Sequence, residues 1–367
     1  MNSDSVLWSK RRELLALGAM VSIYFLSYFQ RTAVPGTIFN QLQSDMRLSA
    51  SGVTALGAVC LYVYACAQIF VGITADRFGG GRTLVFGGLV MAAGAVLFPL
   101  AHTPWEAYAS RAVTGLGASF MYLSIVKEVD ALFGARLFPV LIGPMLFGGY
   151  CGGLAATSPF NWAATVYGWR PALLAVGVLT FALVGLTWLV LHKLDHPVPS
   201  GRTLSLRPLL TILRQGRNWP LLICAFINYP SYFVFQSTLG KKLLEDSAGM
   251  SASSAAHVLF VMMAVSAGLT FFSGPFLRLT GHRRRPLLTT VPVLVLTGIG
   301  LLWFAVAYRA PGGVFVAGCV VLASASAVSP VGITTMKELN DPDTVAQSVA
   351  VLNGMCYLGV AVLANVA

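Results

Sequence analysis

Apolar residues fill eleven long runs of this chain, and short polar or Gly/Pro-rich breaks separate them. A helix needs about 20 mainly apolar residues to cross a hydrocarbon core of about 30 Å, and the runs have about that length. The pattern therefore predicts eleven transmembrane helices and an all-α membrane fold. The runs lie at about 14–41, 52–74, 83–101, 105–127, 137–160, 171–191, 219–239, 254–277, 287–308, 312–335 and 345–367.

One charged, loop-like stretch divides these runs into six and five. We expect a cytoplasmic linker there, at 193–218, between an N-terminal bundle at 1–192 and a C-terminal bundle at 219–367. The last run reaches the final residue, so the second bundle should hold about five helices, with a twelfth helix cut off. The first run is too long for the apolar region of a cleaved signal peptide, so we expect it to be retained as a helix.

Similar loops follow the second and the eighth run. Residues 72–82 read GITADRFGGGR and residues 274–284 read GPFLRLTGHRR, so two glycines and the last arginine match at an offset of 202 residues. Parallel repeats with the solute held between them are a recurrent transporter design. The loops therefore predict two related bundles with a pseudo-two-fold axis along the membrane normal.

Composition agrees with lipid as the solvent. The chain is 56% hydrophobic and 10% charged, with a mean hydropathy of +0.76, whereas an average soluble domain has about 25% charged residues. Although the net charge is +11, the basic residues are not clustered in one part of the chain, as they would be in a nucleic-acid-binding surface. If the N-terminus is inside, the inside loops hold 16 basic residues, the outside loops hold five, and three lie within the runs. This asymmetry predicts a cytoplasmic N-terminus in a plasma membrane, such as a bacterial inner membrane, with no nucleic-acid partner.

Cysteines and histidines give no sign of a metal, a cofactor or an enzyme site. The six cysteines lie within apolar runs without a C-x-x-C pair, which is typical of small buried hydrophobic residues. Four of the five histidines lie in or near loops, whereas an intramembrane enzyme needs convergent catalytic groups. A non-transporting receptor or sensor is the alternative from another class, and no added sensory domain supports it.

The helix count, the division into two sets and one loop motif together resemble the major facilitator superfamily. The matching loop residues are Gly72, Asp76, Arg77, Gly79 and Arg82. Gly80 and Gly81 stand where the family pattern has two basic residues. The resemblance implies that the loop is a gating motif, in which the carboxylate meets a cation or a helix N-terminus and locks one half-bundle. The alternative is that these charged residues reflect only the usual excess of basic residues in cytoplasmic loops.

A second signature lies on the fourth run. Arg111 and Gly115, with Gly117, are similar to the family's Arg-x-x-x-Gly-x-Gly element, and the resemblance implies a part in proton coupling or in helix packing. Lys127 is followed three residues later by Asp130, so a local ion pair is expected.

Glu128 lies towards the cytoplasmic end of the same run, where it can exchange protons or cap the solvated helix end. The fifth run carries a glycine-rich stretch at 143–153, a loose version of an element known from antiporters of this family.

Arg31 is the best candidate for binding a solute. It lies near the middle of the first run, where a charge costs about 2.5–3.5 kcal/mol and is a functional candidate by default. Tyr24 and Tyr28 fall on the same helical face, within an arc of about 60°. Its planar fork suits a carboxylate or a phosphate. The stretch 24–31 resembles helix 1 of organic-anion and organophosphate carriers, in which an arginine binds substrate; pairing with an internal acid is the alternative.

Neutral hydrogen-bonding groups lie on the seventh run. Asn228, Tyr232 and Gln236 follow at intervals of four and share a face, so they can bind the solute or join helices. The repeat places Phe233 at the position of Arg31. Because a doubly charged phosphate favours two cations, the single arginine favours a monocarboxylate, a zwitterion or a peptide-like solute.

The sequence therefore predicts a monomeric secondary transporter that moves a small anionic or zwitterionic organic solute by alternating access. Moving an anion inward against a negative-inside potential costs about 2.3 kcal/mol per charge per 100 mV, so a compensating cation is needed. Acidic side chains that could bind Na⁺ do not form a cluster within the apolar runs. We therefore favour symport with a proton. Anion exchange by the same fold is the alternative. The pattern names neither the solute nor the direction of transport.

Overall fold

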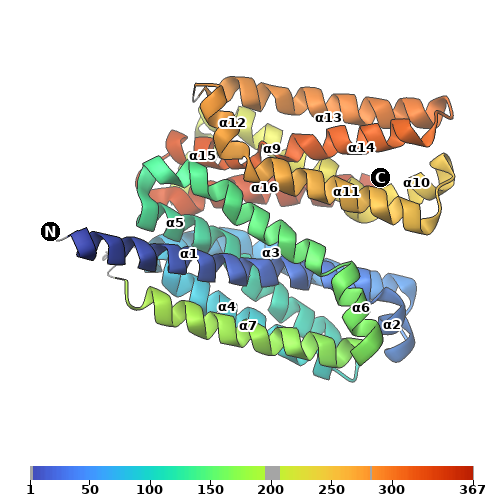
Figure 1. The fold of residues 1–367 in the computed structure, drawn as a ribbon, viewed down its shortest axis with the longest axis horizontal. Helices are drawn as coiled ribbons and strands as arrows, with labels where there is room; N and C mark the ends of the chain where they lie inside the picture. Colours follow the sequence, from blue (N-terminus) through green and yellow to red (C-terminus); the bar gives the residue numbers. More distant parts are fainter. Residues whose placement is uncertain (1–2, 195–206, 282, 367) are drawn as a thin grey trace. The chain divides into compact units, whose positions relative to one another are not determined.

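The computed structural model is built from helices throughout the residues that it describes, which are 3–194, 207–281 and 283–366 (Figure 1). No strand occurs in this part of the chain. The predicted apolar runs fall mainly in helical segments of these residues, so the all-α membrane fold is confirmed. Within these described residues, eight helices are long and apolar enough to cross a bilayer, by length and composition.

The chain forms two compact units. Unit 1 comprises Met1–Ala135 and Gly148–Leu206, and unit 2 comprises Arg136–Phe147 and Arg207–Ala367. Most of the linker expected at 193–218 lies outside the described residues, since 195–206 are not described. Within that stretch, Arg207–Arg214 form the helix α8 and Gly216–Asn218 form a 3₁₀ turn.

Unit 1 contains the helices of the first half of the sequence. They are α1 (Ser3–Thr32), a π-helical turn (Ala33–Thr37), α2 (Phe39–Asp45), α3 (Ala50–Phe78), α4 (Gly80–Leu100), most of α5 (Pro104–Ala155), α6 (Ser158–Tyr167) and α7 (Trp169–Leu191). The long α5 holds two predicted runs, and Gly134 breaks it with φ of 66° and ψ of 178°. A left-handed φ of this kind favours glycine.

Unit 2 contains the remaining helices. They are α8, α9 (Trp219–Val234), a π-helical turn (Phe235–Leu239), α10 (Gly240–Ala248), α11 (Ala252–Phe271), α12 (Ser273–Leu279), α13 (Arg284–Ala307), α14 (Gly312–Ser326), α15 (Ser329–Leu339), a 3₁₀ turn (Pro342–Thr344) and α16 (Val345–Val366). A reciprocal hydrogen-bonded pair of buried amides, Asn218 and Asn340, ties the start of α9 to the end of α15.

Local backbone features recur between the two halves of the chain at the offset of 202 residues. The π-helical turns Ala33–Thr37 and Phe235–Leu239 are separated by that offset. Ser49 and Ser251, also 202 residues apart, cap α3 and α11 by accepting a backbone N–H three residues on. Local structure thus supports the repeat read from the loops, while the superposition of whole bundles stays a prediction.

Helices in unit 1 approach closely at glycines. A Cβ added at Gly117 of α5 would lie 2.5 Å from Met91 Cα of α4, and one at Gly115 would clash with the main chain of Cys60 of α3. In lipid, where apolar surface gains little by being buried, such small residues allow the backbone contact that holds helices together. The Gly-x-Gly of the sequence signature is therefore a packing element on both of its sides.

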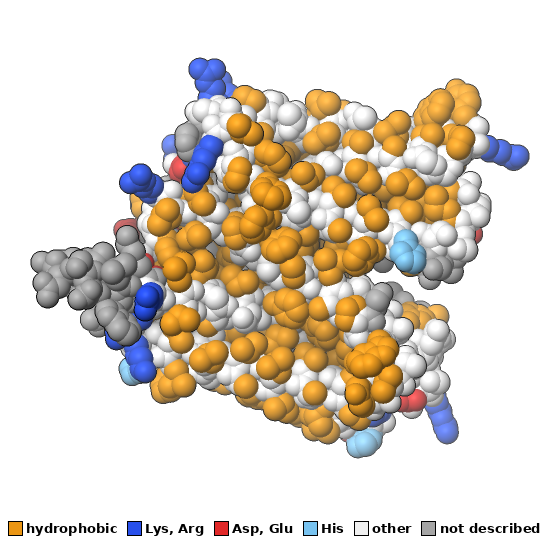
Figure 2. Space-filling view, in the orientation of Figure 1, with side chains coloured by type: hydrophobic (Ala, Val, Ile, Leu, Met, Phe, Trp, Pro, Cys, Tyr) orange, Lys and Arg blue, Asp and Glu red, His pale blue; other side chains and the backbone are white. Residues whose placement is uncertain are grey.

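Apolar side chains cover the flanks of each unit, and charged side chains gather towards the helix ends (Figure 2). Trp105, Trp162, Trp303 and Tyr308 are among the most exposed large side chains. Such an apolar surface is inconsistent with water as the surrounding solvent and fits a lipid-facing flank, with aromatic rings near the interfaces.

We predict that Gly117→Ala destabilises the protein by about 1–3 kcal/mol, because the added methyl group overpacks the contact between α5 and α4. Gly185→Ala on α7 is the matched control, since nothing lies within 4 Å of its added Cβ. Thermal unfolding of the two variants in the same detergent measures the difference. Equal midpoints would contradict the packing role of Gly117.

Candidate functional site

Arg31 lies at the end of α1, half-buried among tyrosine rings of unit 1. Its Cζ is 4.1 Å from the ring centre of Tyr28 and 5.1 Å from that of Tyr64 on α3. Its Nε donates to the carbonyl oxygen of Ser27 at 3.3 Å. A guanidinium stacked on aromatic faces gains a cation–π interaction, which is strongest where water is excluded. The arginine is therefore oriented by the rings and by its own helix.

Further tyrosines extend this cluster. Tyr24 meets Tyr28 edge-on at 5.2 Å between ring centres and stacks on Tyr122 at 6.2 Å. Tyr28 also lies 5.7 Å from Tyr150. The shared face of Tyr24, Tyr28 and Arg31 was readable from helical spacing, whereas Tyr150 was missed because only the fold brings α5 against α1. We call Arg31 and these five rings the tyrosine cluster.

A glycine on α5 makes room for the cluster. A Cβ at Gly149 would lie 2.6 Å from Tyr24 Cε1 and 2.8 Å from Tyr28 Cδ2. Its neighbours in the glycine run face other parts of α1, since Gly148 opposes the Val21 side chain and Gly152 opposes the Phe25 main chain. The glycine run thus lets α5 approach α1 alongside the rings that surround Arg31.

Arg111 on α5 is almost completely buried, with 1% of its surface exposed. NH1 donates to the carbonyl oxygen of Gln30 at 3.1 Å, NH2 to that of Val34 at 3.0 Å, and Nε to that of Leu56 at 3.4 Å. The first two carbonyls flank the break in α1, where Val34 is non-helical and Pro35 supplies no N–H. This geometry favours helix packing over proton coupling as the role of Arg111.

Asp76, near the end of α3, forms a buried ion pair within unit 1. Its Oδ1 lies 2.9 Å from Nζ of Lys127, and the two side chains are 4% and 12% exposed. The sequence pairs Lys127 with Asp130 on the same helix, but the ion pair seen here joins α3 to α5. Helical spacing reveals only neighbours on one helix, so the partner on another helix could not be read from it.

Glu128 caps the helix that follows the loop. Its Oε2 accepts the backbone N–H of Gly81 at 2.6 Å, where a carboxylate also meets the positive end of the helix dipole. A Cβ at Gly80 would lie 2.7 Å from the backbone nitrogen of Glu128. This close approach explains why glycines stand where the related loops carry basic residues. Glu128 thus holds the start of α4 against α5, and it is buried instead of lying at a solvated helix end.

The other loop residues take less constrained positions. Gly72 is buried and Gly79 has φ of 88°. Arg77 lies over its neighbour Phe78, 5.1 Å from the ring centre, and Arg82 is exposed. These two arginines therefore lie outside the Asp76–Lys127 pair.

Asn228, Tyr232 and Gln236 lie in unit 2. Asn228 is buried and donates to the carbonyl oxygen of Ala325 on α14 at 3.2 Å. Tyr232 is buried in the apolar core of the unit, and Gln236 is half-buried in the π-helical turn. At least Asn228 therefore takes part in joining helices, which was the alternative to solute binding.

Metal-binding chemistry has no counterpart in the described residues, because His, Cys, Asp and Glu side chains nowhere come together there in groups of three or more. The six cysteines are free thiols.

Comparison with known proteins gives one family match and several relatives. Residues 20–364 match the family described as Major Facilitator Superfamily. Human monocarboxylate transporter 7 is 27% identical over 168 residues, which cover 45% of this chain and 32% of that protein. The match thus spans about a third of that relative.

Solved structures give the same fold. The proton:xylose symporter XylE bound to 6-bromo-6-deoxy-D-glucose has a TM-score of 0.72 at 16% identity, covering 99% of this chain and 88% of its own. The transporter FucP in the outward conformation has a TM-score of 0.72 at 15% identity, covering 97% and 91%. At such identities the likeness establishes the fold alone.

We predict that Arg111→Lys lowers the free energy of unfolding by about 2–3 kcal/mol, because a lysine cannot reproduce the fork that meets three carbonyls and leaves buried acceptors unsatisfied. Denaturant or thermal unfolding in detergent measures this loss. Wild-type stability together with abolished transport would instead place Arg111 in coupling.

Proposed function

Since the chain belongs to the major facilitator superfamily, we propose that it moves a small anionic or zwitterionic organic solute whose carboxylate binds Arg31. It is a multi-pass membrane transporter, and its family and fold neighbours are transporters, not enzymes. Its partners are accordingly a small-molecule substrate and the lipid bilayer. The finer assignment of the solute rests on the tyrosine cluster.

The cation–π contact between Arg31 and Tyr28 carries this proposal. Arginine stays protonated in proteins and offers paired N–H donors that fit a carboxylate. The rings keep the cation in an apolar, partly buried setting, where an anion gains more from the charge than in water. The tyrosine hydroxyl groups add neutral hydrogen-bond donors and acceptors for the rest of the solute. The human relative, named a monocarboxylate transporter, has a matching solute class.

The second half of the repeat supplies no matching cation. At the offset of 202 residues, Phe233 corresponds to Arg31 in the sequence, and its ring stacks on Tyr229 at 5.5 Å between centres. A single arginine favours one carboxylate over a phosphate ester with two negative charges. Gln236 and the remaining acceptor of Asn228 are the candidate neutral contacts from this half, whereas Tyr232 lies in the apolar core of unit 2.

Gating is assigned to the junction between α3 and α4. The buried pair of Asp76 and Lys127 and the capping of α4 by Glu128 hold unit 1 together at this end of its helices. A rigid half-bundle is what alternating access by rocking requires. We assign Gly72, Gly79, Arg77 and Arg82 to the same gate.

Proton symport is the proposed coupling, because an anion must enter with a compensating cation. The structural neighbour XylE is named a proton symporter. Exchange of one anion for another is the second candidate, and the glycine run of α5 beside the tyrosine cluster favours it. We further propose a monomer in a plasma membrane, with a cytoplasmic N-terminus on the positive-inside count.

Arg31→Lys is predicted to raise the KM for the solute by about tenfold or more, because the charge stays but the paired donors are lost. Arg47→Lys is the matched control, since Arg47 is an exposed arginine of unit 1. The measurement is uptake into proteoliposomes of a labelled panel of carboxylates, peptides and phosphate esters. Unchanged uptake by a normally expressed Arg31→Lys variant would remove Arg31 from the site.

For the coupling, we predict that an inward proton gradient drives accumulation of the solute that the panel identifies. The same proteoliposomes are tested with and without the gradient, and with an anion preloaded inside. Uptake that ignores the gradient but rises with the preloaded anion would exclude symport and establish exchange.

A further inference from the structure

The corner between α12 and α13 carries a concentrated positive charge. Arg278, Arg283 and Arg285 are exposed there. The sequence from Ser247 to Lys337 contains no acidic residue. The next acid, Glu338, is engaged by the guanidinium of Arg284 through both oxygens, with NH2 to Oε1 at 2.6 Å. Three cations therefore remain beside a carboxylate that is already paired.

Hydrogen bonds hold this corner in a defined turn. Thr280 Oγ1 donates to the carbonyl oxygens of Leu277 at 2.9 Å and Arg283 at 3.0 Å. The backbone N–H of Gly281 bonds to the carbonyl oxygen of Arg278 at 2.9 Å, and Gly281 has φ of 60°. These bonds join the end of α12 to the carbonyl oxygens of Leu277, Arg278 and Arg283, close to the exposed arginine side chains.

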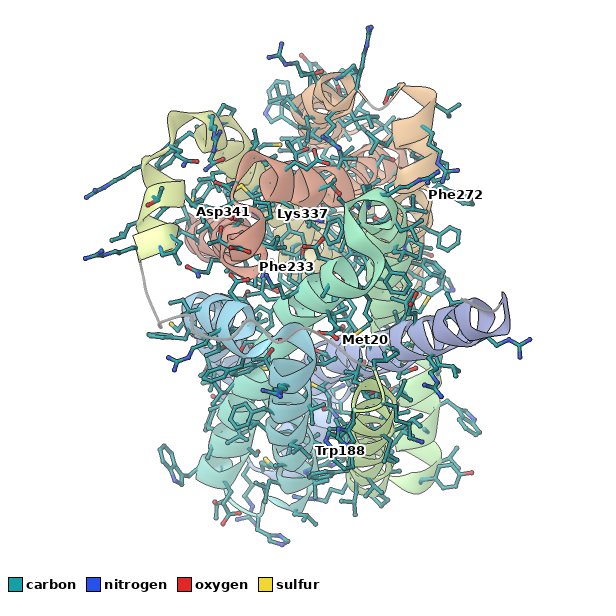
Figure 3. All side chains as sticks on the ribbon, turned by 90° about the vertical axis from the view of Figure 1, so that its left-hand side faces the viewer. Met20, Trp188, Phe233, Phe272, Lys337 and Asp341 are labelled. Carbon is teal, nitrogen blue, oxygen red and sulfur yellow. The ribbon has the colours of Figure 1, made fainter. Side chains whose placement is uncertain are left out.

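An apolar stripe adjoins the arginines. Phe272, Phe276 and Leu279 are 51%, 37% and 83% exposed and fall on one face of α12. The opposite face, with Leu277, is buried. Phe272 lies at the edge of unit 2 in Figure 3. Cations at one end of an exposed apolar stripe match the headgroup and the acyl chain of a lipid.

The first half of the repeat lacks this surface. At the offset of 202 residues, Arg278 corresponds to Asp76, and that acid is buried and paired with Lys127. The charge at this position is thus inverted between the two copies of the loop. Where the first copy joins two helices of its own unit, the second copy presents its cation outward.

We propose that this surface binds an anionic phospholipid of the leaflet that it faces. The surface consists of the side chains of Arg278, Arg283, Arg285, Phe272, Phe276 and Leu279. The phosphodiester accepts hydrogen bonds from the arginines, and an acyl chain lies along the stripe. Charge complementarity selects an anionic over a zwitterionic headgroup, since clustered basic residues beside a membrane attract anionic lipid. The stripe selects a lipid over free phosphate.

The test is thermal unfolding of the full chain in detergent during titration with phosphatidylglycerol or phosphatidylcholine of identical acyl chains. Phosphatidylglycerol should stabilise the wild type at concentrations about tenfold or more below those of phosphatidylcholine. The triple variant R278Q/R283Q/R285Q should bind phosphatidylglycerol about tenfold to a hundredfold more weakly. Arg284 is left intact because it holds Glu338.

The matched control is the triple variant R136Q/R214Q/R217Q, which removes three other exposed arginines of unit 2. It should keep the preference for phosphatidylglycerol. An equal loss in this control would overturn the site in favour of net charge, and equal binding of both lipids by the wild type would overturn the headgroup selection.

Leu279→Gln separates a lipid from a soluble anion. It keeps every arginine but interrupts the stripe, so phosphatidylglycerol should bind more weakly. Inorganic phosphate should neither stabilise the wild type nor compete with the lipid. Competition by phosphate, with Leu279→Gln unchanged, would show an anion site without a lipid and overturn the proposal.

Discussion

A membrane-spanning backbone must satisfy its own polar groups, because hydrocarbon offers no hydrogen bonds. Helices meet this demand everywhere except where they break, and α1 breaks at Ala33–Thr37. Arg111 resolves that exception by donating to the carbonyls of Gln30 and Val34, and it ties the same point to α3 through Leu56. The position of Arg31, directly after Gln30, depends on this clamp.

Close packing then builds the tyrosine cluster on the fixed helix. Gly149 admits the Tyr24 and Tyr28 rings against α5, while Tyr28 and Tyr64 flank the guanidinium of Arg31. Arg31 and Arg111, both in unit 1, thus have different surroundings. Arg111 donates to three backbone carbonyls and so joins helices, whereas Arg31 is stacked on rings and is the one proposed to bind an anion.

The two copies of the loop show how a repeat diverges by charge. In unit 1, Asp76 and Glu128 join helices of the same unit, and glycines replace bulky cations because α4 and α5 touch there. In unit 2 the equivalent of Asp76 is Arg278, and the acid nearby, Glu338, is held by Arg284. The same turn therefore serves internal packing in one half and an outward cationic surface in the other.

The sequence by itself determined the all-α membrane fold, the repeat offset of 202 residues and the shared face of Tyr24, Tyr28 and Arg31. These follow from run length and helical period, which are local properties of the chain. Only the tertiary structure decided the partners. Lys127 meets Asp76, Tyr150 joins the cluster, and Arg111 binds carbonyls, and each of these contacts joins different helices. Spacing along one helix carries no information about which other helix packs against it.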